Sequence, residues 1–140
     1  MNALLNTILT FSLLCGCVTA EPLKILFFSG GGKTADTGHN GRMNHHKLIP
    51  DFLRANIDLT YSDQLEDLNP ETLSLYEAVI MYRGGAIGKP ERIEHIIDYV
   101  EKGGGLVAIH HTCGAFDGDS DCISLIGGEF ARHGSGIFTA

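Results

Sequence analysis

Histidine is the residue type that stands out in this sequence, with 7 among 140 residues. An imidazole can bind a metal ion through a neutral ring nitrogen, and it can move protons near neutral pH. Two of the histidines, His110 and His111, are adjacent and follow directly on the apolar run 106–109. We therefore predict that His110 and His111 are the central catalytic pair.

Three further histidines are candidates for the same site. His39 and His46 follow the first apolar run of the chain, and His133 comes after a Gly-Gly turn. Together with His110 they form the predicted ligand set for a divalent metal such as zinc. Since adjacent helical residues diverge by about 100°, His45 is the less favoured of its pair. The spacing matches no strong metal motif, so a hydrogen bond to loop backbone is the alternative for each ring.

Other side chains near the ends of the apolar runs suggest substrate contacts. Tyr82 and Arg83 can hold sugar hydroxyls or a carboxylate, although a solvated surface role is the alternative for both. Cys113 is a weaker candidate nucleophile, because its surroundings do not match the G-x-C-x-G elbow pattern. Cys113 and Cys122 could form a disulfide in an oxidising compartment or remain free thiols.

The hydrophobic pattern alternates between two kinds of element. Apolar runs predict strands, and helical spacing of apolar residues predicts helices. The predicted strands are 23–29, 57–61, 78–82 and 106–109, and the predicted helices are 44–55, 70–75, 89–102 and 121–126. This order predicts an α/β fold with a parallel sheet and helices on both faces. Ligands bind such sheets beyond the carboxyl ends of the strands. Six of the seven histidines lie in segments that can reach this end of the sheet.

Composition narrows the class of protein. The formal net charge is −7, from 17 acidic and 10 basic residues, which argues against a nucleic-acid-binding surface. Hydrophobic residues make up 44% and charged residues 19%, values that exclude a disordered chain. A length of 140 residues predicts one domain.

The two ends of the chain carry separate expectations. Residues 1–20 contain no charged side chain, and their apolar run is too short to span a bilayer, so we expect a signal peptide and a domain at 21–140. The protein would then be exported, with membrane attachment only through a lipid on Cys17 if the lipobox-like Leu14–Cys17 is processed. The last five residues, 136–140, look like the start of a strand, so we also expect a C-terminal truncation.

Several of these segments resemble the trehalose-utilisation (ThuA-like) domain: the Gly103–His111 run, Leu125–Gly128, and the first strand with its histidines. The resemblance implies a flavodoxin-like sheet related to class I glutamine amidotransferases, in which a cysteine stands where this chain has His110. It therefore argues against amidotransferase activity. It also implies a role in carbohydrate catabolism, on a sugar or 3-keto-glycoside, through a His-rich site in which an imidazole or a bound metal polarises a carbonyl or moves a proton. The alternative is a non-catalytic carbohydrate- or metal-binding module.

Overall fold

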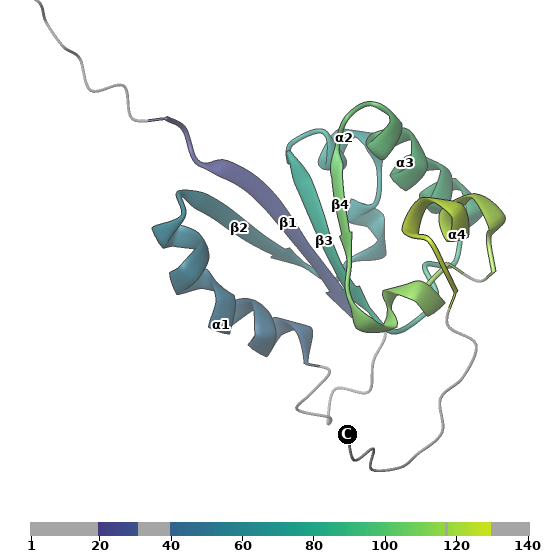
Figure 1. Ribbon diagram of the computed structural model, residues 1–140, viewed down its shortest axis with the longest axis horizontal. Coiled ribbons are helices and arrows are strands. Elements are labelled where there is room, and N and C mark those ends of the chain that lie inside the picture. Colours follow the sequence, from purple (N-terminus) through teal and green to yellow (C-terminus); the bar gives the residue numbers. More distant parts are fainter. Residues whose placement is uncertain (1–19, 31–39, 117, 130–140) are drawn as a thin grey trace, which may run out of the picture.

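The computed structural model describes residues 20–30, 40–116 and 118–129, and its centre is a parallel four-stranded sheet (Figure 1). The strand order is β2-β1-β3-β4. The bounds are Leu23–Gly30 for β1, Ile57–Ser62 for β2, Ala78–Arg83 for β3 and Gly105–Ala108 for β4. All three strand pairs run parallel, so the predicted α/β class is confirmed.

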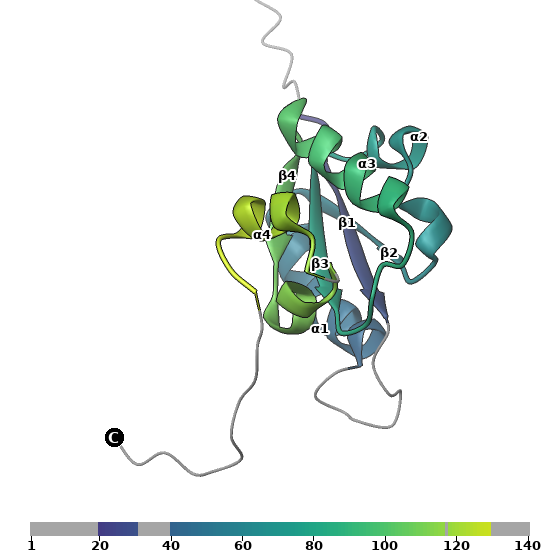
Figure 2. The ribbon, with the colours of Figure 1, turned by 90° about the vertical axis from the view of Figure 1, so that its right-hand side faces the viewer.

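Helices cover both faces of this sheet. Helix α1 lies on one face and α3 on the other, as Figure 2 shows with α3 in front of the strands and α1 behind them. The helices are α1 (Gly41–Arg54), α2 (Pro70–Leu73), α3 (Pro90–Glu101) and α4 (Ser120–Ile126), and two 3₁₀ turns are η1 (Leu65–Asp67) and η2 (His110–Gly114).

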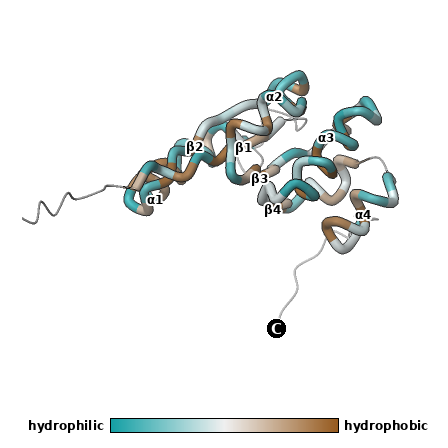
Figure 3. Tube along the Cα trace, turned by 90° about the horizontal axis from the view of Figure 1, so that it is seen from above, coloured by the Kyte–Doolittle hydropathy of each residue, from teal (hydrophilic) through white to brown (hydrophobic). Residues whose placement is uncertain are grey.

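Strand β1 shows why its run of apolar residues is continuous rather than alternating. Leu26 and Phe28 point to the α3 side, where they meet Ile93 and Ile96 in one core cluster. Phe27 points to the α1 side and packs in a second cluster, with Leu59, Ile80, Leu48 and Phe52. Successive strand residues face opposite sides of a sheet, so a strand covered on both sides must be apolar throughout. Figure 3 shows these hydrophobic segments between α1 and α3.

Helix α1 begins earlier than the sequence pattern indicated. The side chain of Asn40 caps it by accepting a hydrogen bond from the Met43 N–H at 3.0 Å. The helix therefore starts at Gly41, and Pro50 lies in its interior. The predicted range 44–55 therefore begins three residues too late, because the cap at Asn40 decides where the helix starts.

The predicted leader and the C-terminal strand start fall on parts of the chain that are not described, namely 1–19 and 130–140. Within the described ranges, no helix is long and apolar enough to cross a membrane.

Candidate functional site

A strained turn at the carboxyl end of β4 carries the first predicted catalytic residue. His110 has φ of 55°, one of two non-glycine residues with positive φ among those described. This region is uncommon for residues with a side chain, and such strain concentrates at functional sites. The turn follows Ile109, whose N–H still donates to the Met81 carbonyl of β3 at 2.9 Å. The chain then bends into η2, which displays the His110 side chain to solvent.

A buried hydroxyl holds this turn in place. Thr112 is fully buried, and its Oγ1 lies 2.6 Å from the carbonyl oxygen of Met81. The Oγ1 of Thr112 in turn accepts a hydrogen bond from the backbone N–H of Arg83 at 3.3 Å. Thr112 therefore ties η2 to the end of β3, and the position of His110 is set by contacts made two residues further on.

The two adjacent histidines stack on each other. Their ring centroids lie 3.7 Å apart, with 27° between the ring planes. His111 is half-buried beside Gly84, where an added Cβ would lie 3.4 Å from the Cβ of His111. The ring of Tyr82 lies 6.3 Å from that of His110. The structure thus brings together three of the predicted site residues: His110, His111 and Tyr82.

The start of α1 lies against the same edge of the sheet. A Cβ at Gly41 would lie 1.6 Å from the Oγ of Ser29 and 3.6 Å from the Cδ1 of Tyr82, so only glycine allows this approach. The ends of β1 and β3 and the first turn of α1 therefore adjoin the histidine turn. The sequence pattern did not reveal this contact, because Gly41 and Ser29 become neighbours only in the folded chain.

Arg83 is buried, and its guanidinium is used by the loop that follows β3. Its Nε donates to the Gly85 carbonyl at 2.9 Å, and its two Nη atoms lie 3.3 Å from the Ala86 carbonyl oxygen and 3.5 Å from that of Ser29. Burial lowers the pKa of Arg83, and the positive charge of Arg92 lowers it further. The side chain thus has a structural role, and its predicted contact with substrate stays a prediction.

The neighbours His45 and His46 have different surroundings. His45 is buried, and its Nε2 lies 2.9 Å from the Leu59 carbonyl oxygen, so that nitrogen carries the proton. This is a structural bond between α1 and β2. His46 is exposed, with its ring 5.7 Å from that of His45. The aromatic contacts that lead from His46 to His110 run through three intervening rings, those of His45, Phe27 and Tyr82.

A polar cavity of about 410 Å³ lies at the end of β2, on the α1 side of this rim. Arg42 lies over the ring of Tyr61 at 4.5 Å, and its Nη2 is 3.5 Å from the Asp63 carboxylate. Tyr61 donates a hydrogen bond to Asp63 at 3.2 Å. The Gln64 amide lowers the pKa of Asp63 most, and Tyr61 and Arg42 act in the same direction. Tyr61 and Asp63 were not among the predicted site residues, although their position at a strand end is the signal that identified Tyr82.

The stacked pair can supply only one ligand to a metal ion in this arrangement. A metal lies in the plane of each imidazole that binds it, and two nearly parallel rings 3.7 Å apart offer no shared position. Within the described ranges, no three His, Cys, Asp or Glu side chains form a group that could hold a metal. The predicted ligands His39 and His133 lie outside those ranges, so the described residues alone do not fit a metal centre.

The acidic residues close in sequence to the histidine segments are used elsewhere, are exposed or lie outside the described residues. The Asp119 side chain caps α4 by accepting hydrogen bonds from the N–H groups of Asp121 and Cys122. Asp121 and Glu129 are exposed. Asp36 and Asp117 are not described.

Among the described residues, Cys113 and Cys122 are both free thiols, which decides between the two alternatives for this pair. Cys113 is half-buried, and its Sγ lies 3.2 Å from the His110 carbonyl oxygen. Cys122 is buried, and this burial, with the nearby charges of Asp119 and Asp121, raises its pKa to about 11. The thiol of Cys122 therefore stays protonated and unreactive near neutral pH.

Comparisons with known proteins agree with this architecture. Residues 24–139 match the family model ThuA, described as trehalose utilisation. A crystal structure of a ThuA-like protein from Bacteroides uniformis aligns with a TM-score of 0.57 at 16% sequence identity. The alignment covers 69% of this chain and 39% of that one.

At that identity the likeness shows the fold alone, and the chain spans about two fifths of the length of the aligned protein. No curated protein matches the chain. The flavodoxin-like α/β fold is thus confirmed by the parallel sheet and by its structural neighbour. Because the family model matches residues 24–139, well over half of the chain, the chain belongs to the trehalose-utilisation (ThuA) family.

Proposed function

We propose that this chain acts in carbohydrate catabolism, on a sugar or 3-keto-glycoside, at the turn that carries His110 and His111. The family description supports the carbohydrate class. The observation that carries the proposal is the strained, exposed His110 at the carboxyl end of β4, where parallel sheets bind their ligands. A strained residue held by a buried neighbour is typical of a site organised for chemistry.

In this proposal His110 transfers the proton, and His111 holds the His110 ring in position. The His110 ring is exposed and can approach a bound sugar, whereas the half-buried His111 supports one face of that ring. An imidazole can remove the proton beside a sugar carbonyl, or protonate the carbonyl oxygen as charge develops there. Tyr82, on the neighbouring strand, would donate a hydrogen bond to a sugar hydroxyl.

A divalent metal is a further part of the proposal, and no step is derived through it. One ring of the stacked pair would act as ligand, with His39, His46 and His133 as the other candidates. The chemistry that a metal supplies at such a site is polarisation of a carbonyl oxygen. We also propose that the chain is exported through its leader, and that membrane attachment, if the lipobox-like segment is processed, is through a lipid on Cys17.

The test compares two histidine variants of the full chain with a control variant. His110→Gln and His111→Gln are incubated with trehalose, its 3-keto derivative and other glycosides, beside an Arg54→Gln control at an exposed position in the last turn of α1. Loss of a general acid–base group typically costs about 10²- to 10⁴-fold in rate. We expect such a loss for His110→Gln, a smaller loss for His111→Gln and little change for Arg54→Gln.

Equal turnover by His110→Gln and the unmodified chain would remove the proposed chemistry. The second candidate function is a non-catalytic carbohydrate-binding module, which the exposed His110 and the half-buried Tyr61 at the carboxyl ends of the strands also allow. Glycoside binding that His110→Gln weakens, with no product from any glycoside, favours this module over the enzyme.

A further inference from the structure

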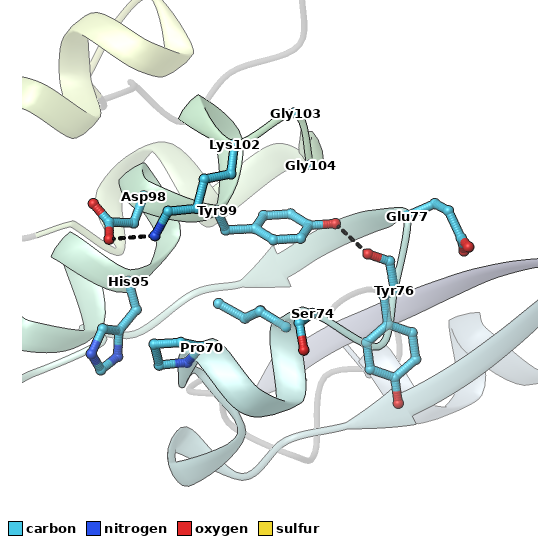
Figure 4. Close-up of a pocket in the computed structure, with 11 residues that line it drawn as sticks. Pro70, Ser74, Tyr76, Glu77, His95, Asp98, Tyr99, Lys102, Gly103 and Gly104 are labelled. Carbon is cyan, nitrogen blue, oxygen red and sulfur yellow. Dashed lines mark hydrogen bonds and ion pairs between the residues drawn. The ribbon is translucent and has the colours of Figure 1, made fainter.

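A second cavity lies at the opposite edge of the sheet from His110, at the amino ends of β3 and β4 (Figure 4). Its volume is about 370 Å³, within the range of small-molecule sites, roughly 300–1,000 Å³. Its floor is apolar and comes from Pro70 and Leu73 of α2. Its upper wall comes from the last turns of α3 and the Gly103–Gly104 turn. Nothing in the proposed function uses this cavity.

The wall contributed by Tyr99 is held rigidly. Its hydroxyl donates to the Tyr76 carbonyl oxygen at 3.0 Å, across the cavity edge shown in Figure 4. One side of the ring lies on Gly104, where an added Cβ would be only 2.3 Å from the Tyr99 Cζ. Gly104 is therefore needed for this ring position, and a ligand in the cavity meets a fixed aromatic surface.

The polar groups around the rim are mostly hydrogen-bond acceptors. The Nδ1 of His95 lies 3.0 Å from the Leu68 carbonyl oxygen, so this nitrogen donates, and in the neutral imidazole Nε2 is then an acceptor. Asp98 and Glu77 also line the cavity, and the Glu77 carboxylate accepts a hydrogen bond from the backbone N–H of Lys24 at 2.7 Å. Lys102 is the one cationic lining residue among those described, and its Nζ pairs with Asp98 at 3.0 Å.

The balance of charge at this rim is negative. Burial raises the pKa of Tyr99, and the negative charge of Glu77 raises it further. The carbonyl end of α3 also points here, which adds partial negative charge. Such a rim favours a ligand that donates hydrogen bonds, and it disfavours anions.

We propose that this cavity binds one pyranose ring, at a site separate from the histidine turn. A pyranose has an apolar C–H face that can lie on Pro70, Leu73 or the Tyr99 ring. Its hydroxyl groups radiate from the ring plane as donors toward His95 and Asp98. The proposal does not depend on the chemistry of His110, since the two sites lie at opposite ends of the strands.

The experiment is a two-dimensional NMR titration of the ¹⁵N-labelled full chain. Glucose is the probe, and sorbitol is the matched ligand control, since it carries similar hydroxyls without a ring face. We expect saturable shifts of the Ser74, Tyr76 and Gly104 amides with glucose and none with sorbitol. Shifts confined to the Tyr82 and His110 region would place the sugar at the histidine turn and overturn this proposal.

Matched variants make the assignment specific. Asp98→Ala removes a rim carboxylate, and Asp51→Ala removes a comparable exposed carboxylate of α1, since each forms a one-turn helix pair with a basic residue. We expect at least fivefold weaker glucose binding for Asp98→Ala and unchanged binding for Asp51→Ala. Ser74→Trp fills the opening from an exposed position and should abolish the shifts. Unaltered glucose binding by Ser74→Trp, or equal shifts with sorbitol, would overturn the proposal.

Discussion

At the scale of single residues, His110 stores backbone strain at the point where the proposed chemistry takes place. Its φ of 55° costs about 1–2 kcal/mol for a residue with a Cβ, and glycine avoids that cost. The strain persists because Thr112 and the last pairing of β4 hold the turn from both sides. Replacement of His110 by glycine should therefore remove activity but relieve the strain that a residue with a Cβ keeps.

The comparison of His110→Gly with His110→Ala tests this trade-off. Both variants lose the imidazole, so both should lose turnover, but only glycine relieves the strain. We expect His110→Gly to have a free energy of unfolding about 1 kcal/mol above that of His110→Ala, measured by urea denaturation. A lower value for His110→Gly would show that the turn is not strained.

The two free thiols should differ in reactivity because only one is accessible. In the folded chain at pH 8, iodoacetamide should modify Cys113 and leave Cys122 unmodified, because Cys122 is buried with a pKa of about 11. Peptide mass mapping of the alkylated protein gives the measurement, with urea-unfolded protein as the control in which both react. Modification of folded Cys122 at the same rate as Cys113 would contradict the buried, protonated thiol.

The same group makes stability depend on alkaline pH. The pKa of Cys122 rises on folding, from 9.0 to about 11, so the folded state keeps the proton longer than the unfolded chain. The protonated Cys122 thiol therefore makes its full contribution to the free energy of unfolding below pH 9. This contribution is lost as the pH rises toward 11. In Cys122→Ala, this part of the alkaline loss should disappear from urea denaturation curves recorded between pH 8 and 11. An identical alkaline loss in both proteins would show that Cys122 does not carry it.

At the scale of elements, the first turn of α1 is held against β1 by a contact that leaves no space for a side chain. A Cβ at Gly41 would lie 2.4 Å from the Cβ of buried Ser29, and a strand residue cannot move away cheaply. This contact places α1, with the polar cavity beside it, next to the histidine turn. The helix start and the site should therefore be disturbed together.

Gly41→Ala should lower the free energy of unfolding by about 1–3 kcal/mol, the usual cost of overpacking. Gly128→Ala is the control, since nothing lies within 4 Å of the added Cβ, and it should change stability by less than about 0.5 kcal/mol. The double variant Ser29→Gly, Gly41→Ala should recover part of the loss. No loss in Gly41→Ala would show that the helix start can shift freely.

At the scale of the whole molecule, the two faces of the sheet are covered unequally. Helix α1 packs on β1 and β2, and the neighbouring strands on that face are less protected. Ile80 of β3 and Val107 of β4 are register partners on this face, yet Ile80 is 8% exposed and Val107 is 49% exposed. Two neighbouring aliphatic residues should thus contribute very differently to stability.

Ile80→Ala should lower the free energy of unfolding by about 2–4 kcal/mol, because it leaves a cavity in a packed cluster. Val107→Ala should cost less than about 1 kcal/mol, because water already reaches this side chain. Urea denaturation of both variants gives the comparison. Equal losses would indicate that another surface covers Val107 in solution.

The type and order of the elements follow from the sequence alone, because periodicity is a local property. Apolar runs such as 23–29 and the helical spacing of Ile93, Ile96 and Val100 indicate strand and helix wherever they are placed. Their alternation is enough to predict a parallel sheet. The position of His110 directly after a strand is enough to identify it as a candidate site residue. The resemblance of the histidine segment to a known family also needed no structure.

Only the tertiary structure decided how the individual side chains are used. His45 is hydrogen-bonded to the Leu59 carbonyl oxygen, and Arg83 is hydrogen-bonded to the loop after β3. The rings of His110 and His111 stack on each other. Each of these outcomes depends on a partner or a backbone angle that residue spacing does not encode. The cavity beside Tyr99 likewise depends on contacts of Tyr99 with Gly104 and with Tyr76, which is distant in sequence. Local patterns specify elements, whereas the packing of distant segments determines which groups remain available for chemistry.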